Sequence, residues 1–240
     1  MWESQRIMSS YADKHASGLI VSKVEDWVFD LDNTIYPAAS SLFPRVARRM
    51  TEWIMDHFSL PEDKAAELKT RLFRQYGTTM RGLMEEFHLP SDGFLSYVHE
   101  IDLSDVSYDK VLDTGLKALP GRKHIYTNGT VRHAERILEA FGIRQHFDVI
   151  FDIVASDHVP KPAPAPYDQF VAQSGIEPTK AVMIEDMARN LEPAAALGMQ
   201  TVWLASDLDW ARQGANEAYV QFVAKDVKDL LTCLTQAETG

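Results

Sequence analysis

Five short apolar runs with helical segments between them constrain the fold of this chain more than any other feature. The runs are 27–29, 123–126, 149–151, 181–184 and 201–204. Each is rich in β-branched or aromatic residues and is flanked by polar or turn residues, which is typical of a buried strand. The segments between them carry apolar residues at helical spacing and end near glycines such as Gly142, Gly175 and Gly198. This alternation predicts a parallel sheet with right-handed crossovers.

One long interval, from about residue 38 to about residue 117, contains no strand-like run. Phe43, Val46 and Met50 begin the spacing of an amphipathic helix. Further helices are expected over 62–76, 79–87, 93–100 and 108–118. We therefore predict an α/β fold, a three-layer doubly wound parallel sheet, with an inserted all-helical cap. The core domain would comprise residues 1–37 and 117–240, and the cap domain residues 38–116.

Composition excludes several other classes of protein. The chain has 240 residues, a net charge of −11, 45% hydrophobic and 25% charged residues, which excludes collagen, disorder and a disulfide scaffold. No run of Lys or Arg offers a site for a nucleic acid polymer or an anionic membrane, so a small-molecule partner is expected. No apolar segment approaches the roughly 18 residues that span a bilayer, and the single Cys233 is expected to be a plain thiol. We expect a soluble cytoplasmic protein, monomeric or homodimeric.

Polar residues follow the predicted strands at the edge where open parallel sheets bind ligands. Asp30 and Asp32 come after the first strand and would point the same way in an extended segment. Such a pair of carboxylates requires a cation, and Asp186, after a neighbouring strand, could complete the ligand set of a Mg²⁺ ion. A metal beside an Asp nucleophile is suited to phosphoryl transfer, because it offsets the repulsion between two anions.

Two further motifs have a structural and a functional interpretation. Thr127, Asn128 and Gly129 could form an ordinary strand-ending turn, but a Thr hydroxyl and adjacent amides also make a phosphate cradle. Lys161 could be a solvated surface lysine. Prolines on both sides stiffen its backbone, however, as would be needed to hold a cation against a phosphate.

In this order the motifs resemble those of the haloacid dehalogenase-like (HAD) hydrolase superfamily, whose core is Rossmann-like, and the resemblance extends from about residue 27 to 204. It implies that Asp30 is the nucleophile and Asp32 the general acid and base, holding the proton that a leaving alkoxide needs. Thr127 and Lys161 would hold the phosphoryl group. Mg²⁺ would be bound by Asp30, Asp186 and a backbone contact of Asp32. The predicted insert corresponds to the family's C1 cap.

Within the superfamily the chain looks like the pyrimidine 5′-nucleotidase-like group. The matching segments are Asp-Asn-Thr-Ile-Tyr-Pro at 32–37, Tyr-Gly-Thr-Thr-Met-Arg-Gly-Leu at 76–83 and Tyr-Val-His at 97–99. The resemblance implies a phosphatase acting on a small phosphate monoester such as UMP or CMP. Tyr76, Arg81 and His99 would contact substrate from the cap, although Tyr76 could equally be a core residue and Arg81 a solvated one. The chain departs from the group at Glu185, Met187 and Asn190, which leaves open how the metal site is supported.

Three rival functions stay open at this point. A phosphomutase shares the first half-reaction, a dehalogenase shares the fold, and a catalytically silent phosphate-binding regulatory protein shares the site. Asp32 argues against a dehalogenase, since carbon-centred displacement needs neither a metal nor an acid for a leaving alkoxide. The remaining histidines show no metal-binding spacing, and no direct role is expected for them: His88, His124, His133, His146 and His158.

Overall fold

A computed structural model describes residues 11–236 of the chain. Its centre is a six-stranded, wholly parallel sheet in the order β3-β2-β1-β4-β5-β6. The strands are β1 (Asp26–Phe29), β2 (Arg122–Tyr126), β3 (Val149–Phe151), β4 (Ala181–Glu185), β5 (Gln200–Leu204) and β6 (Phe222–Ala224). The five predicted strands are confirmed, and β6 is a sixth strand that the sequence did not reveal.

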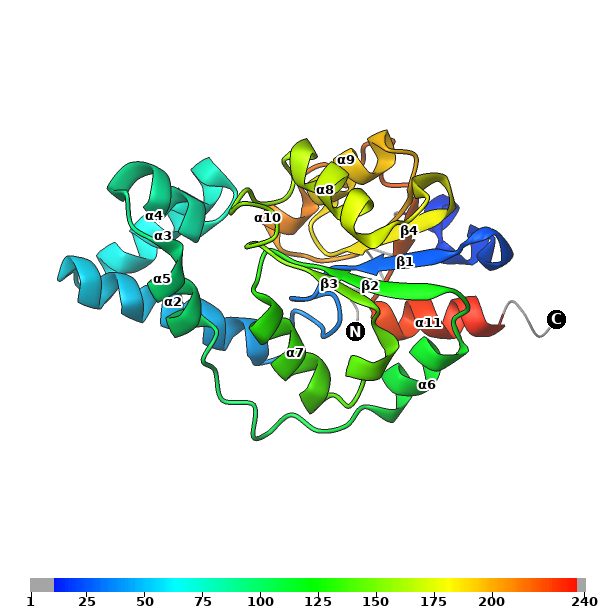
Figure 1. Cartoon of the computed structure of the whole chain (residues 1–240), viewed down its shortest axis with the longest axis horizontal. Helices are drawn as coiled ribbons and strands as arrows, with labels where there is room; N and C mark the ends of the chain where they lie inside the picture. The colour runs from blue at the N-terminus through cyan, green and yellow to red at the C-terminus, as the bar shows by residue number, and fades with distance from the viewer. Residues whose placement is uncertain (1–10, 237–240) are drawn as a thin grey trace.

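Helices cover both faces of the sheet, so the core has three layers (Figure 1). One face carries α8 (Pro164–Ser174) and α9 (Leu191–Ala196), and the other carries α6 (Lys110–Ala118), α7 (Val131–Ala140) and α11 (Val227–Gln236). The side chains of β1 alternate between these layers: Val28 packs in one apolar cluster, and Trp27 and Phe29 pack in the other. Both faces of the sheet are therefore buried, as expected of parallel strands with helical crossovers.

Several short elements complete the core. They are α10 (Asp209–Arg212) and the 3-10 helices η1 (Ala12–Lys14), η2 (Ala16–Gly18), η3 (Val21–Lys23), η4 (Arg144–His146), η5 (Pro178–Lys180) and η6 (Ala188–Asn190). Of these, η6 matters most for the site, because it follows directly after the polar residues at the end of β4 and leads into α9.

The register of the central strands brings their polar ends to one level. Phe29 of β1 pairs with Ile125 of β2 and with Ile184 of β4. Thr127, Asp30 and Asp186 each follow within two residues of these partners. The chemically important residues are thus delivered side by side at the carboxyl edge of the sheet.

Four helices between β1 and β2 form what we call the helical insert, at the left of Figure 1. They are α2 (Leu42–Phe58), α3 (Glu62–Tyr76), α4 (Thr79–Phe87) and α5 (Ser91–Val98). Helices α3 and α4 approach closely at Gly82, where a Cβ atom would lie 2.7 Å from that of Leu72. The insert has buried residues of its own, including Leu72, Leu83 and Phe94.

The helix predicted over 108–118 lies on the core rather than in the insert. It corresponds to α6, which packs against α11. The contact is close at Gly115, where a Cβ atom would lie 2.9 Å from Leu231 Cβ. The last helix of the insert ends at Val98, and the cap boundary expected at residue 116 stays a prediction. Within residues 11–236, no helix combines the length and apolar character needed to cross a membrane.

Candidate active site

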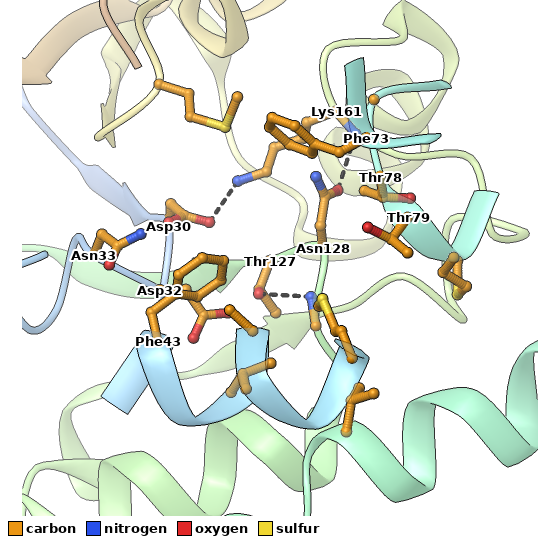
Figure 2. A pocket seen from close by; sticks show the side chains of 18 of the residues that line it. Asp30, Asp32, Asn33, Phe43, Phe73, Thr78, Thr79, Thr127, Asn128 and Lys161 are labelled. Carbon is orange, nitrogen blue, oxygen red and sulfur yellow. Dashed lines mark hydrogen bonds and ion pairs between the residues drawn. The ribbon is translucent and has the colours of Figure 1, made fainter. Parts of the chain in front are cut away.

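A fully buried ion pair lies at the carboxyl edge of the sheet. Lys161 Nζ donates to Asp30 Oδ1 at 2.7 Å (Figure 2). It also donates to the carbonyl oxygen of Tyr126 at 2.9 Å. Side-chain exposure is 1% for Lys161 and 8% for Asp30. Burial alone would lower the pKa of Lys161, but the charges of Asp30 and Glu185 outweigh it and raise the pKa, so the ammonium stays charged. Lys161 is thus not a solvated surface lysine.

Glu185, at the end of β4, is the second partner of this lysine. Lys161 Nζ lies 3.1 Å from Glu185 Oε1, and the backbone N–H of Asp186 donates to Glu185 Oε2 at 2.9 Å. The amide of Asn190 also donates to Glu185. Glu185 and Asn190, at which the chain departs from the nucleotidase-like group, therefore complement each other. An ionised Asp at position 190 could not donate this hydrogen bond. Met187 lines the adjacent cavity.

Three buried carboxylates converge on a point that suits a cation. One oxygen from each of Asp30, Glu185 and Asp186 lies within 4.8 Å of the others. Burial and the charge of Glu185 raise the pKa of Asp30 to about 7, and burial with Glu185 and Asp30 raises that of Asp186 well above its usual range. The raised pKa values reflect three carboxyl groups crowded around the single positive charge of Lys161. A divalent cation at this point would favour the ionised carboxylates, and an all-oxygen donor set suits a hard ion.

Asp32 faces a different environment from Asp30. His133 Nε2 lies 3.0 Å from Asp32 Oδ1, and the Tyr36 hydroxyl donates to the same oxygen. Burial would raise the pKa of Asp32, but the charge and hydrogen bond of His133, together with Tyr36, outweigh it and lower the pKa. The lowered pKa favours an ionised Asp32 in the free protein, and its role as general acid and base stays a prediction. Its carboxylate is also absent from the acidic cluster formed by the described residues.

The segment after β2 is held in a defined shape. The backbone N–H of Gly129 donates to Thr127 Oγ1 at 2.9 Å, and the backbone N–H of Lys161 donates to Asn128 Oδ1 at 2.9 Å (Figure 2). Thr127 is buried beside Asp30 and Asp32 in the lining of the cavity. Asn128 thus fixes the backbone that carries Lys161 and couples two of the predicted motifs.

A cavity of about 300 Å³ opens between this polar edge and the helical insert. Its floor consists of the polar residues described above. Its walls are largely apolar or aromatic: Phe43, Val46, Met50, Phe73, Met80, Phe94, Leu95, Val98 and Trp210. Lys69, Thr78 and Thr79 add polar groups to the wall. The cavity therefore has a charged end and an apolar end.

The three residues predicted to contact substrate from the cap are not brought together. His99 lines the cavity, whereas Tyr76 and Arg81 line a separate groove beside Pro160. Arg81 is paired with Glu85 at 2.5 Å, one helical turn further on. Burial and the neighbouring His133 lower the pKa of His99 to about 3, so its imidazole stays neutral.

Three contributors to the site were not predicted from the sequence. His133 had been assigned no direct role, Tyr36 was noted only within a motif, and Trp210 was not considered. Thr130 caps α7 by accepting a hydrogen bond from the N–H of His133 at 3.3 Å. This threonine could have indicated from the sequence where α7 begins. An N-cap at 130 places His133 in the first turn, at the edge of the sheet.

The chain belongs to the haloacid dehalogenase-like hydrolases, whose sequence profile matches residues 28–198. Solved structures with this fold include both phosphatases and haloacid dehalogenases. A HAD phosphatase from Thermococcus onnurineus superposes with a TM-score of 0.60 at 17% identity, covering 88% of this chain and 98% of that one. At this identity the likeness concerns the fold alone.

Two curated proteins are similar in sequence over part of their length. Phosphate metabolism protein 8 of Saccharomyces cerevisiae is 25% identical over 189 residues, which is 71% of this chain and 58% of that protein. Fructose-1-phosphate phosphatase YqaB of Escherichia coli is 38% identical over 71 residues, which is 29% of this chain and 36% of that protein. The chain thus spans less than two thirds of either relative.

Proposed function

We propose that this hydrolase is a Mg²⁺-dependent phosphatase that cleaves a small phosphate monoester through an aspartyl-phosphate on Asp30. The observation that carries the proposal is the Asp30–Lys161 pair beside Glu185 and Asp186. This arrangement combines a carboxylate nucleophile, a fixed cation and an oxygen-rich metal site in one buried cluster. The names of the two curated relatives, which concern phosphate metabolism and a sugar phosphatase, agree with this class of reaction.

Asp30 and Asp186 are the residues that would hold Mg²⁺, because Glu185 is already engaged by Lys161 and Asn190. When bound, the ion would neutralise phosphate charge and so allow an anionic nucleophile to approach. Lys161 keeps its ammonium 2.7 Å from Asp30, where it can also pair with an oxygen of the transferring group. Thr127 and Asn128 line the same end of the cavity, and the Thr127 hydroxyl and the backbone N–H of Asn128 would donate to the remaining phosphate oxygens.

Asp32 is suited to proton transfer because it lies in the cavity wall without belonging to the acidic cluster. Its carboxylate is ionised in the free protein and is ready to act as a base toward the water that hydrolyses the aspartyl-phosphate. The proton for the leaving oxygen would be taken up when the ester binds, because the negative charge of the phosphate raises the pKa of a carboxyl group beside it.

We propose a pyrimidine nucleoside 5′-monophosphate, UMP or CMP, as the substrate. The aromatic wall of the cavity, with Phe43 and Phe73 facing the polar edge in Figure 2, supports a leaving group with a flat apolar surface. Lys69, Thr78 and Thr79 supply polar groups for the edge of a base. A polyhydroxylated sugar would leave most of its hydroxyl groups against apolar side chains, which is unfavourable.

A panel of phosphate esters tests the proposal. The purified protein, with saturating Mg²⁺, should release phosphate from UMP and CMP with a kcat/KM at least about tenfold above that for fructose 1-phosphate. Release of free phosphate with no bisphosphate activator would separate a phosphatase from a phosphomutase. Failure to turn over every ester would favour a silent phosphate-binding protein, and halide release from a haloacid would favour a dehalogenase.

A matched pair of variants tests the aromatic wall. Phe73→Ala removes a cavity-lining ring, and Phe87→Ala removes a half-buried ring of the insert that is not part of the described lining. Only Phe73→Ala should raise the KM for UMP, by about tenfold or more, since loss of a stacked ring costs on the order of 1 kcal/mol or more. Equal effects of the two variants would contradict this assignment of the wall.

A further inference from the structure

The carboxylate of Asp32 is held from the side of the core by a deeply buried imidazole. His133 is 1% exposed at its side chain, against 20% for Asp32, and Nε2 lies 3.0 Å from Asp32 Oδ1. The Tyr36 hydroxyl donates to the same oxygen. Both contacts are made to Oδ1, and neither involves Oδ2. Asp32 is therefore anchored through Oδ1 while its side chain lines the cavity.

His133 is in turn covered by a residue of the helical insert. The ring of His99, the residue that follows α5, stacks on the ring of His133 with centroids 4.3 Å apart and planes inclined by 17°. His99 Nδ1 lies 3.1 Å from Thr130 Oγ1. Arg136 of α7 donates to the carbonyl oxygen of His99 at 2.8 Å and to that of Ile101 at 2.8 Å. Helix α7 and its N-cap residue Thr130 thus bind the chain where it leaves the insert.

These contacts form a continuous path from the insert to Asp32. The face of the His133 ring is covered by His99 and its edge points at Asp32, so rotation of the imidazole would disrupt both contacts. A shift of about 1 Å in a catalytic group can cost up to about 100-fold in rate. The position of Asp32 is therefore sensitive to whether His99 is docked.

We propose that His133 is a positioning residue that orients Asp32 for proton transfer, and that His99 makes this orientation depend on the docked insert. This inference rests on the proposed phosphatase function, in which Asp32 transfers protons. It assigns a role to a pair of stacked histidines, one from the core and one from the insert.

Two aryl esters isolate the proton-transfer step. Phenyl phosphate and 4-nitrophenyl phosphate are similar in shape, but the nitrophenolate leaves without a proton whereas phenolate is the poorer leaving group. The ratio of their kcat/KM values reports the step that forms the aspartyl-phosphate, and it is insensitive to the later water attack that both esters share. Saturating Mg²⁺ is present throughout.

Substitutions at position 133 distinguish the effect of the hydrogen-bond donor from the effect of the ring. His133→Phe keeps a flat ring against His99 but loses the donor, and should lower kcat/KM for phenyl phosphate by about 30-fold or more while changing that for 4-nitrophenyl phosphate by less than about fivefold. His133→Gln keeps a donor and should recover about tenfold of the loss. Tyr36→Phe removes the other donor and should shift the ratio in the same direction, which keeps the test available if His133→Phe does not fold.

Substitutions at position 99 test the dependence on the insert. His99→Ala removes the ring that covers His133. It should lower the ratio of kcat/KM for phenyl phosphate to kcat/KM for 4-nitrophenyl phosphate by about tenfold, and His99→Phe should restore this ratio. In the double variant His99→Ala/His133→Phe the losses should be less than additive, because both substitutions act through Asp32.

His124 provides the matched control. It is also a buried histidine whose Nε2 meets a carboxylate, Asp26 Oδ1 at 2.9 Å, but it lies within the core sheet away from the cavity lining. His124→Phe should alter thermal stability while leaving the ratio of the two esters at the wild-type value. Equal loss on both esters in His133→Phe and Tyr36→Phe, or a wild-type ratio in His99→Ala, would overturn the inference. A wild-type protein inactive on both aryl esters and also on UMP and CMP would instead refute the proposed function, and this inference with it.

Discussion

Lys161 Nζ lies 2.7 Å from Asp30 Oδ1 although 131 residues separate the two positions, and both side chains are buried. Glu185, 3.1 Å from the same ammonium, makes the pair a triad of one cation and two carboxylates. Buried charges of this kind are costly unless each has a partner. The stability of the protein and the chemistry of the site therefore depend on the same few atoms.

Removal of the ammonium should destabilise the fold strongly. Lys161→Met leaves Asp30 and Glu185 buried without their cation and should lower the free energy of unfolding by about 3–5 kcal/mol, measured by urea denaturation without added metal. The double variant Lys161→Met/Glu185→Gln should recover part of this loss but none of the activity. Lys180→Met, which breaks the exposed pair with Glu25, should cost less than about 1 kcal/mol. Similar losses for the two lysines would contradict this account of the triad.

Mg²⁺ should raise the melting temperature of the wild-type protein, because it relieves repulsion among Asp30, Glu185 and Asp186. Asp186→Asn removes one of these charges. The metal-free variant should be at least as stable as the metal-free wild type, and its melting temperature should no longer respond to Mg²⁺. Differential scanning calorimetry with a chelator and then with excess Mg²⁺ measures both effects. An unchanged Mg²⁺ response in Asp186→Asn would mean that the ion binds elsewhere.

His99 should make the folded state less stable in acid. An unfolded chain protonates this imidazole near pH 6.5, whereas burial and His133 hold the pKa in the folded protein at about 3. The unfolded state thus binds more protons as the pH falls below 6.5, and stability is lost over that range by up to about 1.4 kcal/mol per pH unit.

His99→Phe cannot titrate, so its stability relative to wild type should improve by about 1–2 kcal/mol between about pH 7 and about pH 5. Urea midpoints at the two pH values provide the measurement. His57→Phe, which removes an exposed imidazole stacked on Trp53, is the control. A relative stability that does not change with pH in His99→Phe would show that His99 titrates normally in the folded protein.

Much of the core could be predicted because its signals are local. The apolar runs of β1 and β4 are bounded by polar residues, and Asp30, Thr127, Lys161 and Asp186 follow their strands or loops directly. Strand β6 (Phe222–Ala224) was missed because Gln221 interrupts the apolar run to which it belongs. The packing of helix α6 against α11 could not be predicted, because the periodicity of α6 shows that one face is buried but not which partner covers it.

The contacts of Asp32 could not be predicted, since they depend on how distant segments meet. His133 is 101 residues away, and its approach follows from the parallel pairing of β1 and β2 together with the start of α7. The position of Arg81 had a local signal that was overlooked. Glu85 lies one turn later on the same helix, a spacing that favours an ion pair and leaves Arg81 less available to a ligand.

The central claim, that Asp30 carries the phosphoryl group, is tested most directly by trapping the intermediate. Protein mixed with a radiolabelled phosphate monoester and Mg²⁺, then quenched in acid, should retain label on the peptide that contains Asp30, and hydroxylamine should release it as expected of an acyl phosphate. Asp30→Asn should retain no label and should lose at least about 1,000-fold in kcat, or about 4 kcal/mol of transition-state stabilisation. Label retained by Asp30→Asn, or a variant that keeps more than about a tenth of the wild-type kcat, would contradict the assignment of Asp30 as the nucleophile.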